Sequence, residues 1–219
     1  MTEYDTVLFD SDGVLVEPPA YETQVEATRA AFGEVGIKEA ETQYIDEVVS
    51  GLTIERLHEI CVAYDLDPEV FWEAREHHDE QSQLTKFRDG SRRCYEDAAI
   101  LSQLDQNRGI VSNNHHSTIE FVLNFFDLRS SFDIYYGREK TIESLRLKKP
   151  NTYYLEQALD DLDADSALYV GDSESDLVAA ERTGISSVFV RRPHCYDEEL
   201  TAVPTFETDD LYEVAALLE

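Results

Sequence analysis

The chain has 219 residues, of which 42% are hydrophobic, and its 47 acidic and 18 basic residues give a formal net charge of −29. This apolar content is enough for a folded core and excludes a disordered chain, and the charge argues against nucleic acid or an anionic membrane as a partner. The length fits one α/β domain or a core domain with an insertion.

The acidic residues are spread along the whole chain. This pattern resembles proteins of halophilic organisms, whose acidic surfaces repel one another less at high salt concentration. The alternative is an acidic substrate tail or a basic protein partner, for which a localised acidic block would be expected.

Cys61, Cys94 and Cys195 lie far apart and lack CxxC spacing, so they indicate neither a disulfide framework nor a zinc site. No apolar stretch approaches the roughly 18 residues of a membrane span, and the first residues lack the pattern of a signal peptide. We therefore expect a soluble, cytoplasmic protein.

The first apolar run in the chain, Val7–Phe9, has the length of a buried strand. The next segments carry apolar residues at three- and four-residue spacing, which predicts helices. These segments are Ala20–Val35, Glu41–Ser50, Ile54–Tyr64 and Pro68–Leu84.

From Arg88 onward, strands alternate with helices. The runs of strand length are Gly109–Val111, Phe132–Tyr136, Ala167–Val170 and Ser187–Val190, followed by a loop at 193–206 and a last helix at Leu211–Leu218. This alternation predicts a doubly wound parallel sheet with right-handed crossovers. We expect an α/β core of residues 1–16 and 85–219 with an inserted all-helical cap of residues 17–84.

The first strand leads directly into Asp10 and Asp12, with Gly13 behind them. In parallel α/β sheets, ligands bind at the carboxyl ends of the strands. An acidic pair there is costly unless a cation or a proton-transfer task requires it. The alternative is a strand followed by an ordinary Asp-Gly turn.

Two later segments carry weaker signals. The run Gly109–Val111 delivers Ser112 and Asn113 to the entrance of a helix, where free N–H groups and a hydroxyl bind phosphate. Ordinary turn and capping chemistry is the alternative. Further on, a cationic pair, Lys148 and Lys149, precedes Pro150.

The run Ala167–Val170 leads through Gly171 into Asp172, with Asp176 four residues further on. A helix that begins near Ser173 places Asp176 about one turn on, facing back toward Asp172. Three or four carboxylates at the ends of two strands form a hard oxygen site that suits Mg²⁺. Helix capping by aspartate and serine is the alternative.

The order of these features is an acid pair, a helical insert, a serine, Lys-Pro and GDSxxD. Over essentially the full chain this order resembles the haloacid dehalogenase-like (HAD) hydrolase superfamily, and phosphoglycolate phosphatases and β-phosphoglucomutases are its most similar members. The resemblance implies a Rossmann-like core, and the position of the insert is that of the helical-cap subclass.

The resemblance also implies a Mg²⁺-dependent phosphatase that hydrolyses a small phosphomonoester through an aspartyl-phosphate. Asp10 corresponds to the nucleophile, and Asp12 to the general acid that later serves as the general base. Mg²⁺ is then held by Asp10, the backbone carbonyl of Asp12 and Asp172, with Asp176 bound directly or through water.

The same resemblance assigns Ser112, Asn113 and Lys149 to the phosphate. Lys149 is preferred to Lys148 because it adjoins Pro150. His115 and His116 follow the Ser112 loop, and a contact with substrate or cap stays open for both.

Asp12 favours phosphate chemistry over dehalogenation, because displacement of a halide needs no proton. A sugar phosphomutase of the β-phosphoglucomutase type uses the same core and stays open, as does a noncatalytic module that binds a phosphorylated ligand.

Gly51, Thr53 and Arg56 lie in the region of the cap that senses substrate in the family, and a plain helix–turn–helix junction with Gly51 as the helix cap is the alternative. We expect a small phosphorylated metabolite as the partner, and the sequence specifies neither that metabolite nor the oligomeric state.

The spread of acidic charge predicts that the melting temperature rises between low and molar KCl, because salt screens the repulsion between acidic side chains. Thermal unfolding followed by circular dichroism in a KCl series measures this. A flat or falling melting temperature contradicts the interpretation of the surface as halophilic.

Overall fold

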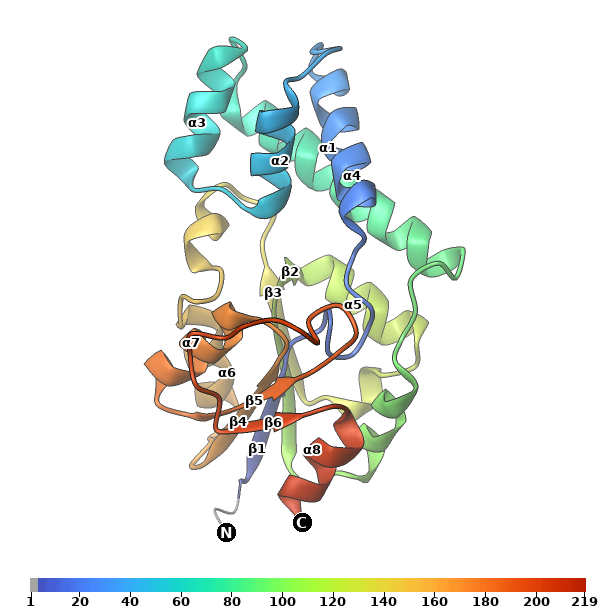
Figure 1. Cartoon of the computed structure of the whole chain (residues 1–219), viewed down its shortest axis with the longest axis vertical. Coiled ribbons are helices and arrows are strands. Elements are labelled where there is room, and N and C mark those ends of the chain that lie inside the picture. Colours follow the sequence, from blue (N-terminus) through green and yellow to red (C-terminus); the bar gives the residue numbers. More distant parts are fainter. Residues whose placement is uncertain (1–3) are drawn as a thin grey trace. The chain divides into compact units, whose positions relative to one another are not determined.

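The computed structural model describes residues 4–219, and the chain forms two compact units (Figure 1). Unit 1 contains the residues up to Pro18 together with Arg93–Arg138 and Leu147–Glu219. Unit 2 contains Pro19–Arg92 and Glu139–Arg146. The chain therefore leaves unit 1 twice.

Unit 1 is an α/β structure built on one parallel sheet of six strands in the order β3-β2-β1-β4-β5-β6. The predicted fold class is therefore confirmed. The strands are β1 (Thr6–Phe9), β2 (Asn107–His115), β3 (Ile134–Arg138), β4 (Ala167–Gly171), β5 (Ser186–Val190) and β6 (Phe206–Thr208).

Helices cover both faces of this sheet. The α-helices of unit 1 are α5 (His116–Phe125), α6 (Tyr153–Asp161), α7 (Glu174–Thr183) and α8 (Leu211–Leu218). Short 3₁₀ helices of unit 1 lie at η1 (Glu96–Gln103) and η2 (Arg129–Ser131), whereas η3 (Glu143–Leu147) lies almost wholly in the segment Glu139–Arg146 of unit 2.

The side chains of β1 alternate between the two faces, as the pleat of a strand requires. Val7 and Phe9 join a buried cluster that includes side chains of α5, α8 and η1. Leu8 joins a different cluster with α6 and α7. All three side chains are fully buried, so β1 is the centre of the core on which the loop at Asp10 rests.

Three predicted strands, β1, β4 and β5, differ from their predicted bounds by one residue, two differ by more, and β6 was not predicted. β2 runs from Asn107 to His115, beyond the short apolar run, because its polar ends still pair with neighbouring strands. β3 begins at Ile134 rather than Phe132. β6 lies at the end of the expected loop, and its three residues are too few to give a periodic signal.

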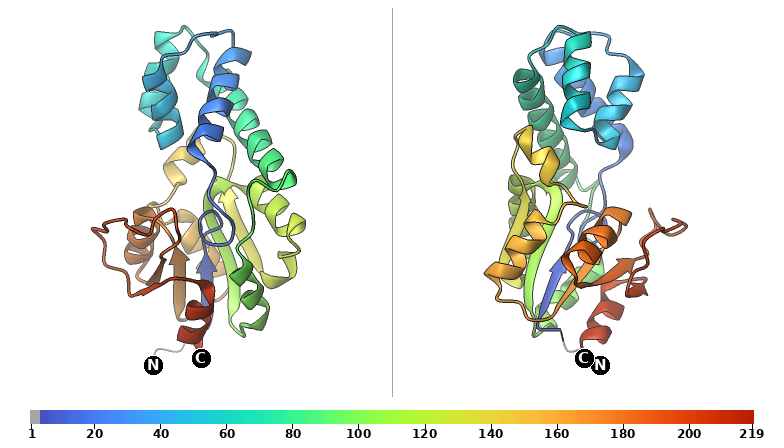
Figure 2. Two further views of the ribbon diagram at one scale, coloured as in Figure 1. Left: turned by 45° about the vertical axis from the view of Figure 1, so that its right-hand side comes forward. Right: turned by 90° about the vertical axis from the view of Figure 1, so that its left-hand side faces the viewer.

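Unit 2 contains α1 (Tyr21–Glu34), α2 (Thr42–Ser50), α3 (Ile54–Ala63) and α4 (Pro68–Arg88), drawn from blue to green in Figure 2. Asp67 caps α4 by accepting from the N–H groups of Glu69 and Val70, and Pro68 occupies its first turn. Apolar side chains of all four helices form a separate buried core.

The division of the chain differs from the expected one in two places. Unit 2 extends to Arg92, since α4 continues to Arg88 instead of ending at Leu84. It also includes Glu139–Arg146, because Ile142 is buried in the helical core and Lys140 pairs with Glu80 at 2.6 Å. None of the helices formed by residues 4–219 has the length and apolar character needed to cross a membrane.

We expect Phe9→Ala to destabilise the protein by about 3–5 kcal/mol, because it leaves a cavity in a fully buried position. Phe9 packs edge-to-face on Phe132, with ring centroids 6.0 Å apart. Urea denaturation measures the change, and Tyr196→Ala at an exposed position of the same unit is the control. Equal stability of the two variants contradicts the central place of β1.

Candidate active site

Most of the predicted site residues of unit 1 lie at or just beyond the carboxyl ends of three neighbouring strands, and Lys149 lies in a turn after η3. Phe9, the last residue of β1, lies opposite Ile110 of β2 and Val170 of β4. The next residues of these strands lead to Asp10, Ser112 and Asp172, so all three emerge at one edge of the sheet. This is the edge at which parallel α/β sheets bind their ligands.

Lys149 brings a positive charge to this edge of the sheet. The residue is buried, with 6% of its surface exposed. Its Nζ lies 3.1 Å from Asp10 Oδ2 and 2.8 Å from Asp176 Oδ1. Nζ also donates to the carbonyl of Val111 and to the hydroxyl of Tyr169. Although burial alone would lower the pKa of Lys149, the two aspartates raise it above its usual value, so the ammonium stays charged.

Asp10 is 8% exposed and lies among like charges. Burial raises the pKa of Asp10 to about 7; Lys149 lowers it, and Asp176, Asp172 and Asp12 add to the increase. Its Oδ1 accepts from the backbone N–H of Ser11 at 2.7 Å. A buried carboxylate among like charges with a raised pKa is typical of a catalytic group or a cation ligand, since it does not stabilise the fold.

Asp176 is fully buried, and the protein itself holds both of its oxygens. Oδ1 faces Lys149, and Oδ2 accepts from the N–H of Asp172 at 3.1 Å and from the N–H and hydroxyl of Ser173 at 3.0 and 2.8 Å. The last bonds form the capping box of α7. The capping alternative therefore describes Asp176 correctly, and the same side chain also pairs with Lys149.

Carboxylate oxygens of Asp10, Asp172 and Asp176 lie within 4.8 Å of one another. This spacing and the hard oxygen donors fit Mg²⁺, which binds a few carboxylates and keeps several waters. Because Asp176 is already saturated, Asp10 and Asp172 are the side chains suited to direct contact with the ion. Gly13, with φ of +80°, leaves room beside them, since a Cβ there would lie 1.8 Å from Asp172 Oδ2.

Asn113 and Lys149 are tied to each other. The Asn113 side chain accepts from the Lys149 N–H at 2.7 Å and donates to the Lys149 carbonyl at 3.3 Å. Its carboxamide thus positions the lysine, and its backbone carbonyl accepts from Arg138 Nε at 3.1 Å. Ser112 is buried, and its Oγ accepts from the N–H of Asn114 at 3.3 Å.

Asn114 is a site residue that the sequence analysis did not identify. Its Nδ2 donates to Asp12 Oδ2 at 2.7 Å, while its Oδ1 accepts from the N–H of His115 at 2.7 Å. Asn114 therefore holds the Asp12 carboxylate in place.

The imidazole of His115 is fully buried, with its Nε2 2.9 Å from Arg138 Nη2, so this histidine packs inside unit 1.

His194 is a second residue that the sequence analysis missed. It lies in the loop after β5, and its Nε2 is 2.6 Å from Asp172 Oδ2. The hydrogen bonds to Asp172 and Cys195 raise the pKa of His194 to about 9. Burial raises the pKa of Asp172, although its hydrogen bond with His194 lowers it.

Comparison with known proteins identifies the family. The model of the haloacid dehalogenase-like hydrolases matches residues 7–190. The chain belongs to this family. The resemblance drawn from its motifs is therefore confirmed.

Two curated relatives are named as a pyrophosphatase and a 5'-nucleotidase. Pyrophosphatase PpaX of Bacillus cereus is 28% identical over 191 residues, which are 85% of this chain and 82% of that protein. A 5'-nucleotidase of Pseudomonas aeruginosa is 24% identical, with coverage of 99% of this chain and 96% of that protein.

Solved structures share the fold. CbbY of Rhodobacter sphaeroides, solved in complex with phosphate, is 18% identical with a TM-score of 0.72 over 96% of each chain. A haloacid dehalogenase-like family hydrolase of Streptococcus pneumoniae is 17% identical with a TM-score of 0.64 over 100% of each chain.

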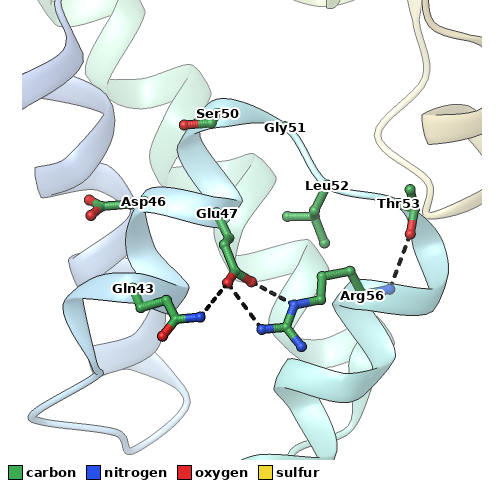
Figure 3. Close-up of a pocket in the computed structure, with 8 residues that line it drawn as sticks. All are labelled: Gln43, Asp46, Glu47, Ser50, Gly51, Leu52, Thr53 and Arg56. Atoms are coloured by element: carbon green, nitrogen blue, oxygen red, sulfur yellow. Dashed lines mark hydrogen bonds and ion pairs between the residues drawn. The ribbon is translucent and has the colours of Figure 1, made fainter.

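The residues predicted to sense substrate lie in unit 2, around a pocket of about 660 Å³ between α2 and α3 (Figure 3). Gly51 ends α2 with φ of +94°, and Thr53 caps α3 by accepting from the N–H of Arg56 at 3.2 Å. The helix–turn–helix junction is thus present. In this haloacid dehalogenase-like hydrolase, the guanidinium of Arg56 pairs with Glu47 at 2.6 Å and with Glu59 at 2.6 Å. These two carboxylates neutralise its charge.

We expect Lys149→Met to destabilise the hydrolase by about 3–5 kcal/mol at pH 8, because it leaves buried carboxylates without their cation. The pKa of Asp10 is about 7 in the folded protein against 3.8 as its usual value. Ionising Asp10 therefore costs folding free energy as pH rises through this window, and Lys149 offsets part of that cost. Chemical denaturation at pH 5 and pH 8 should show the larger loss at pH 8, and an equal loss contradicts the pairing of Lys149 with Asp10.

Proposed function

We propose that this haloacid dehalogenase-like hydrolase is a Mg²⁺-dependent phosphatase that hydrolyses a small phosphomonoester through an aspartyl-phosphate on Asp10. The observation that carries the proposal is the buried Asp10 carboxylate, 3.1 Å from the ammonium of Lys149. Burial removes water from this oxygen nucleophile, and Lys149 favours its ionised form.

In the first step, a carboxylate oxygen of Asp10 attacks phosphorus in line, and the bond from phosphorus to the leaving alcohol breaks. Asp12 donates a proton to the departing oxygen. Asn114 supports this role because its amide holds Asp12 Oδ2 at 2.7 Å. The products of this step are the free alcohol and the phosphorylated Asp10.

In the second step, Asp12 takes a proton from a water molecule that attacks phosphorus. The bond between phosphorus and the Asp10 oxygen breaks, and inorganic phosphate leaves. Ser112, Lys149 and the backbone at Asn113 bind the transferring oxygens and stabilise their charge in both steps. Both carboxyl groups then return to their starting protonation states.

Asp10, the backbone carbonyl of Asp12 and Asp172 would hold Mg²⁺, with Asp176 in support through its contacts to Lys149 and Ser173. When bound, Mg²⁺ supplies positive charge that reduces the repulsion between Asp10 and a phosphate dianion. The spacing of the carboxylates within 4.8 Å supports this assignment.

The substrate class is proposed to be small phosphorylated metabolites, because two relatives are named as a pyrophosphatase and a 5'-nucleotidase. We assign to unit 2 the part of a substrate-selecting cap, with Gly51, Thr53 and Arg56 on its candidate surface. The hydrogen bond from Asn114 Nδ2 to Asp12 Oδ2 favours a hydrolase with a fixed acid and base.

The test is release of phosphate from p-nitrophenyl phosphate and a panel of phosphoglycolate, nucleoside monophosphates, sugar phosphates and pyrophosphate. The assay contains Mg²⁺ and molar KCl. We expect turnover by the wild type, loss of at least about a thousandfold in Asp10→Asn because the nucleophile is gone, and no effect of Asp105→Asn at an exposed position.

EDTA should abolish turnover, and added Mg²⁺ should restore it. Activity that survives EDTA contradicts the metal site, and activity in Asp10→Asn contradicts the covalent step. Folded protein that releases no phosphate from any compound, but interconverts isomers of a sugar phosphate, identifies a phosphomutase instead.

A further inference from the structure

We propose that His194 is a positioning residue, which holds the carboxylate of Asp172 in the orientation that binds the metal ion. The proposal rests on the metal site assigned above and adds a residue to it. It starts from one contact, in which His194 Nε2 lies 2.6 Å from Asp172 Oδ2.

The contact fixes which oxygen of Asp172 is left for the ion. An ionised carboxylate only accepts hydrogen bonds, so Nε2 is the donor and Oδ2 is engaged. The backbone N–H of Asp172 donates to Asp176 Oδ2, which anchors the main chain of the same residue. With main chain and Oδ2 both held, Oδ1 is the oxygen that remains for coordination.

The backbone around His194 is held on both sides. Arg192 is buried, donates to both oxygens of Asp97 at 2.8 and 3.0 Å and reaches the carbonyl of Val14 at 2.8 Å. The N–H of Cys195 bonds to the carbonyl of Arg192 at 3.0 Å, and Cys195 is buried. His194 therefore projects from an anchored turn, and its imidazole needs little further ordering to reach Asp172.

The pair also lies against the loop that carries Asp10 and Asp12. A Cβ added at Gly13 would lie 1.8 Å from Asp172 Oδ2 and 3.0 Å from His194 Nε2. Position 13 therefore has space only for glycine while His194 and Asp172 are in contact. The loop, the carboxylate and the imidazole form one packed arrangement at the site.

A nitrogen donor beside the metal ligands is compatible with this site, because Lys149 Nζ already contacts Asp10 and Asp176. Groups that hydrogen-bond to ligating carboxylates set their orientation, and their loss typically weakens metal affinity about 10- to 100-fold. His194 has this relation to Asp172, although it lies 22 residues further along the chain.

The experiment measures metal affinity directly, without turnover. Mn²⁺ is titrated into the full-length protein, and the free ion is followed by electron paramagnetic resonance. The variants are His194→Ala, His194→Gln, whose amide nitrogen replaces Nε2 as a donor, and Asp172→Asn. His58→Ala, at an exposed position of α3, is the control. Circular dichroism confirms that each variant is folded.

We expect His194→Ala to weaken Mn²⁺ binding about 10- to 100-fold, His194→Gln to restore most of the affinity, and His58→Ala to leave it unchanged. Wild-type affinity in His194→Ala, or tighter binding, overturns the proposal while the metal site itself stands. Electron–nuclear coupling between Mn²⁺ and a nitrogen that is lost in His194→Ala also overturns it, because His194 is then a direct ligand. Failure of the wild type to bind Mn²⁺, with no effect of Asp172→Asn, overturns both the metal site and the role of His194.

Discussion

A buried lysine between two aspartates is the interaction on which the site depends. Lys149 Nζ contacts Asp10 and Asp176, and all three side chains are removed from water. Breaking a buried pair by removing one partner strands the other charge, at a cost of several kcal/mol. Lys149, even together with the protonated His194 at Asp172, carries less positive charge than these carboxylates carry negative charge, since Asp172 and Asp12 also act on Asp10. The remaining negative charge creates a demand for a further cation, and in this account Mg²⁺ meets that demand.

The same contacts serve folding and chemistry. Asp176 begins α7 with one oxygen and holds Lys149 with the other. Tyr169 packs inside β4 and accepts from Lys149 through its hydroxyl, while it donates to the Val111 carbonyl at 2.7 Å. Tyr169 belongs to β4, and Asp176 belongs to the first turn of α7. The positions of Asp10 and Asp172 are therefore fixed by the core rather than by mobile loops. The consequence is an excess of negative charge at the site, and the other acidic residues of the chain, whose formal net charge is −29, do not offset it.

The sheet and the strand-end aspartates could be predicted from the sequence, because buried strands are continuous apolar runs and parallel strands bring their carboxyl ends together. Lys149 was chosen over Lys148 on its place beside Pro150, and its Nζ lies 3.1 Å from Asp10 Oδ2; its contact with phosphate stays a prediction. The partners of these residues could not be predicted in the same way. Asn114 and His194 act through single hydrogen bonds to Asp12 and Asp172, and such pairings depend on tertiary distances that no local pattern encodes. The segment Glu139–Arg146 joins unit 2 through Ile142, which is buried in the helical core, and through the ion pair of Lys140 with Glu80, and these contacts are equally invisible to periodicity.

The central claim is that buried Asp10 is an unbalanced charge that a divalent cation completes. The most direct measurement is carbon-13 NMR of the aspartate carboxyl groups across a pH titration, with the Asp10 resonance assigned by its absence in Asp10→Asn. Without divalent ions, the account predicts that the pKa of Asp10 is about 7, raised by burial. With saturating Mg²⁺, this pKa should fall well below that value, because a bound cation favours the ionised form. An Asp10 that titrates in the ordinary range for aspartate, with no response to Mg²⁺, would contradict the account.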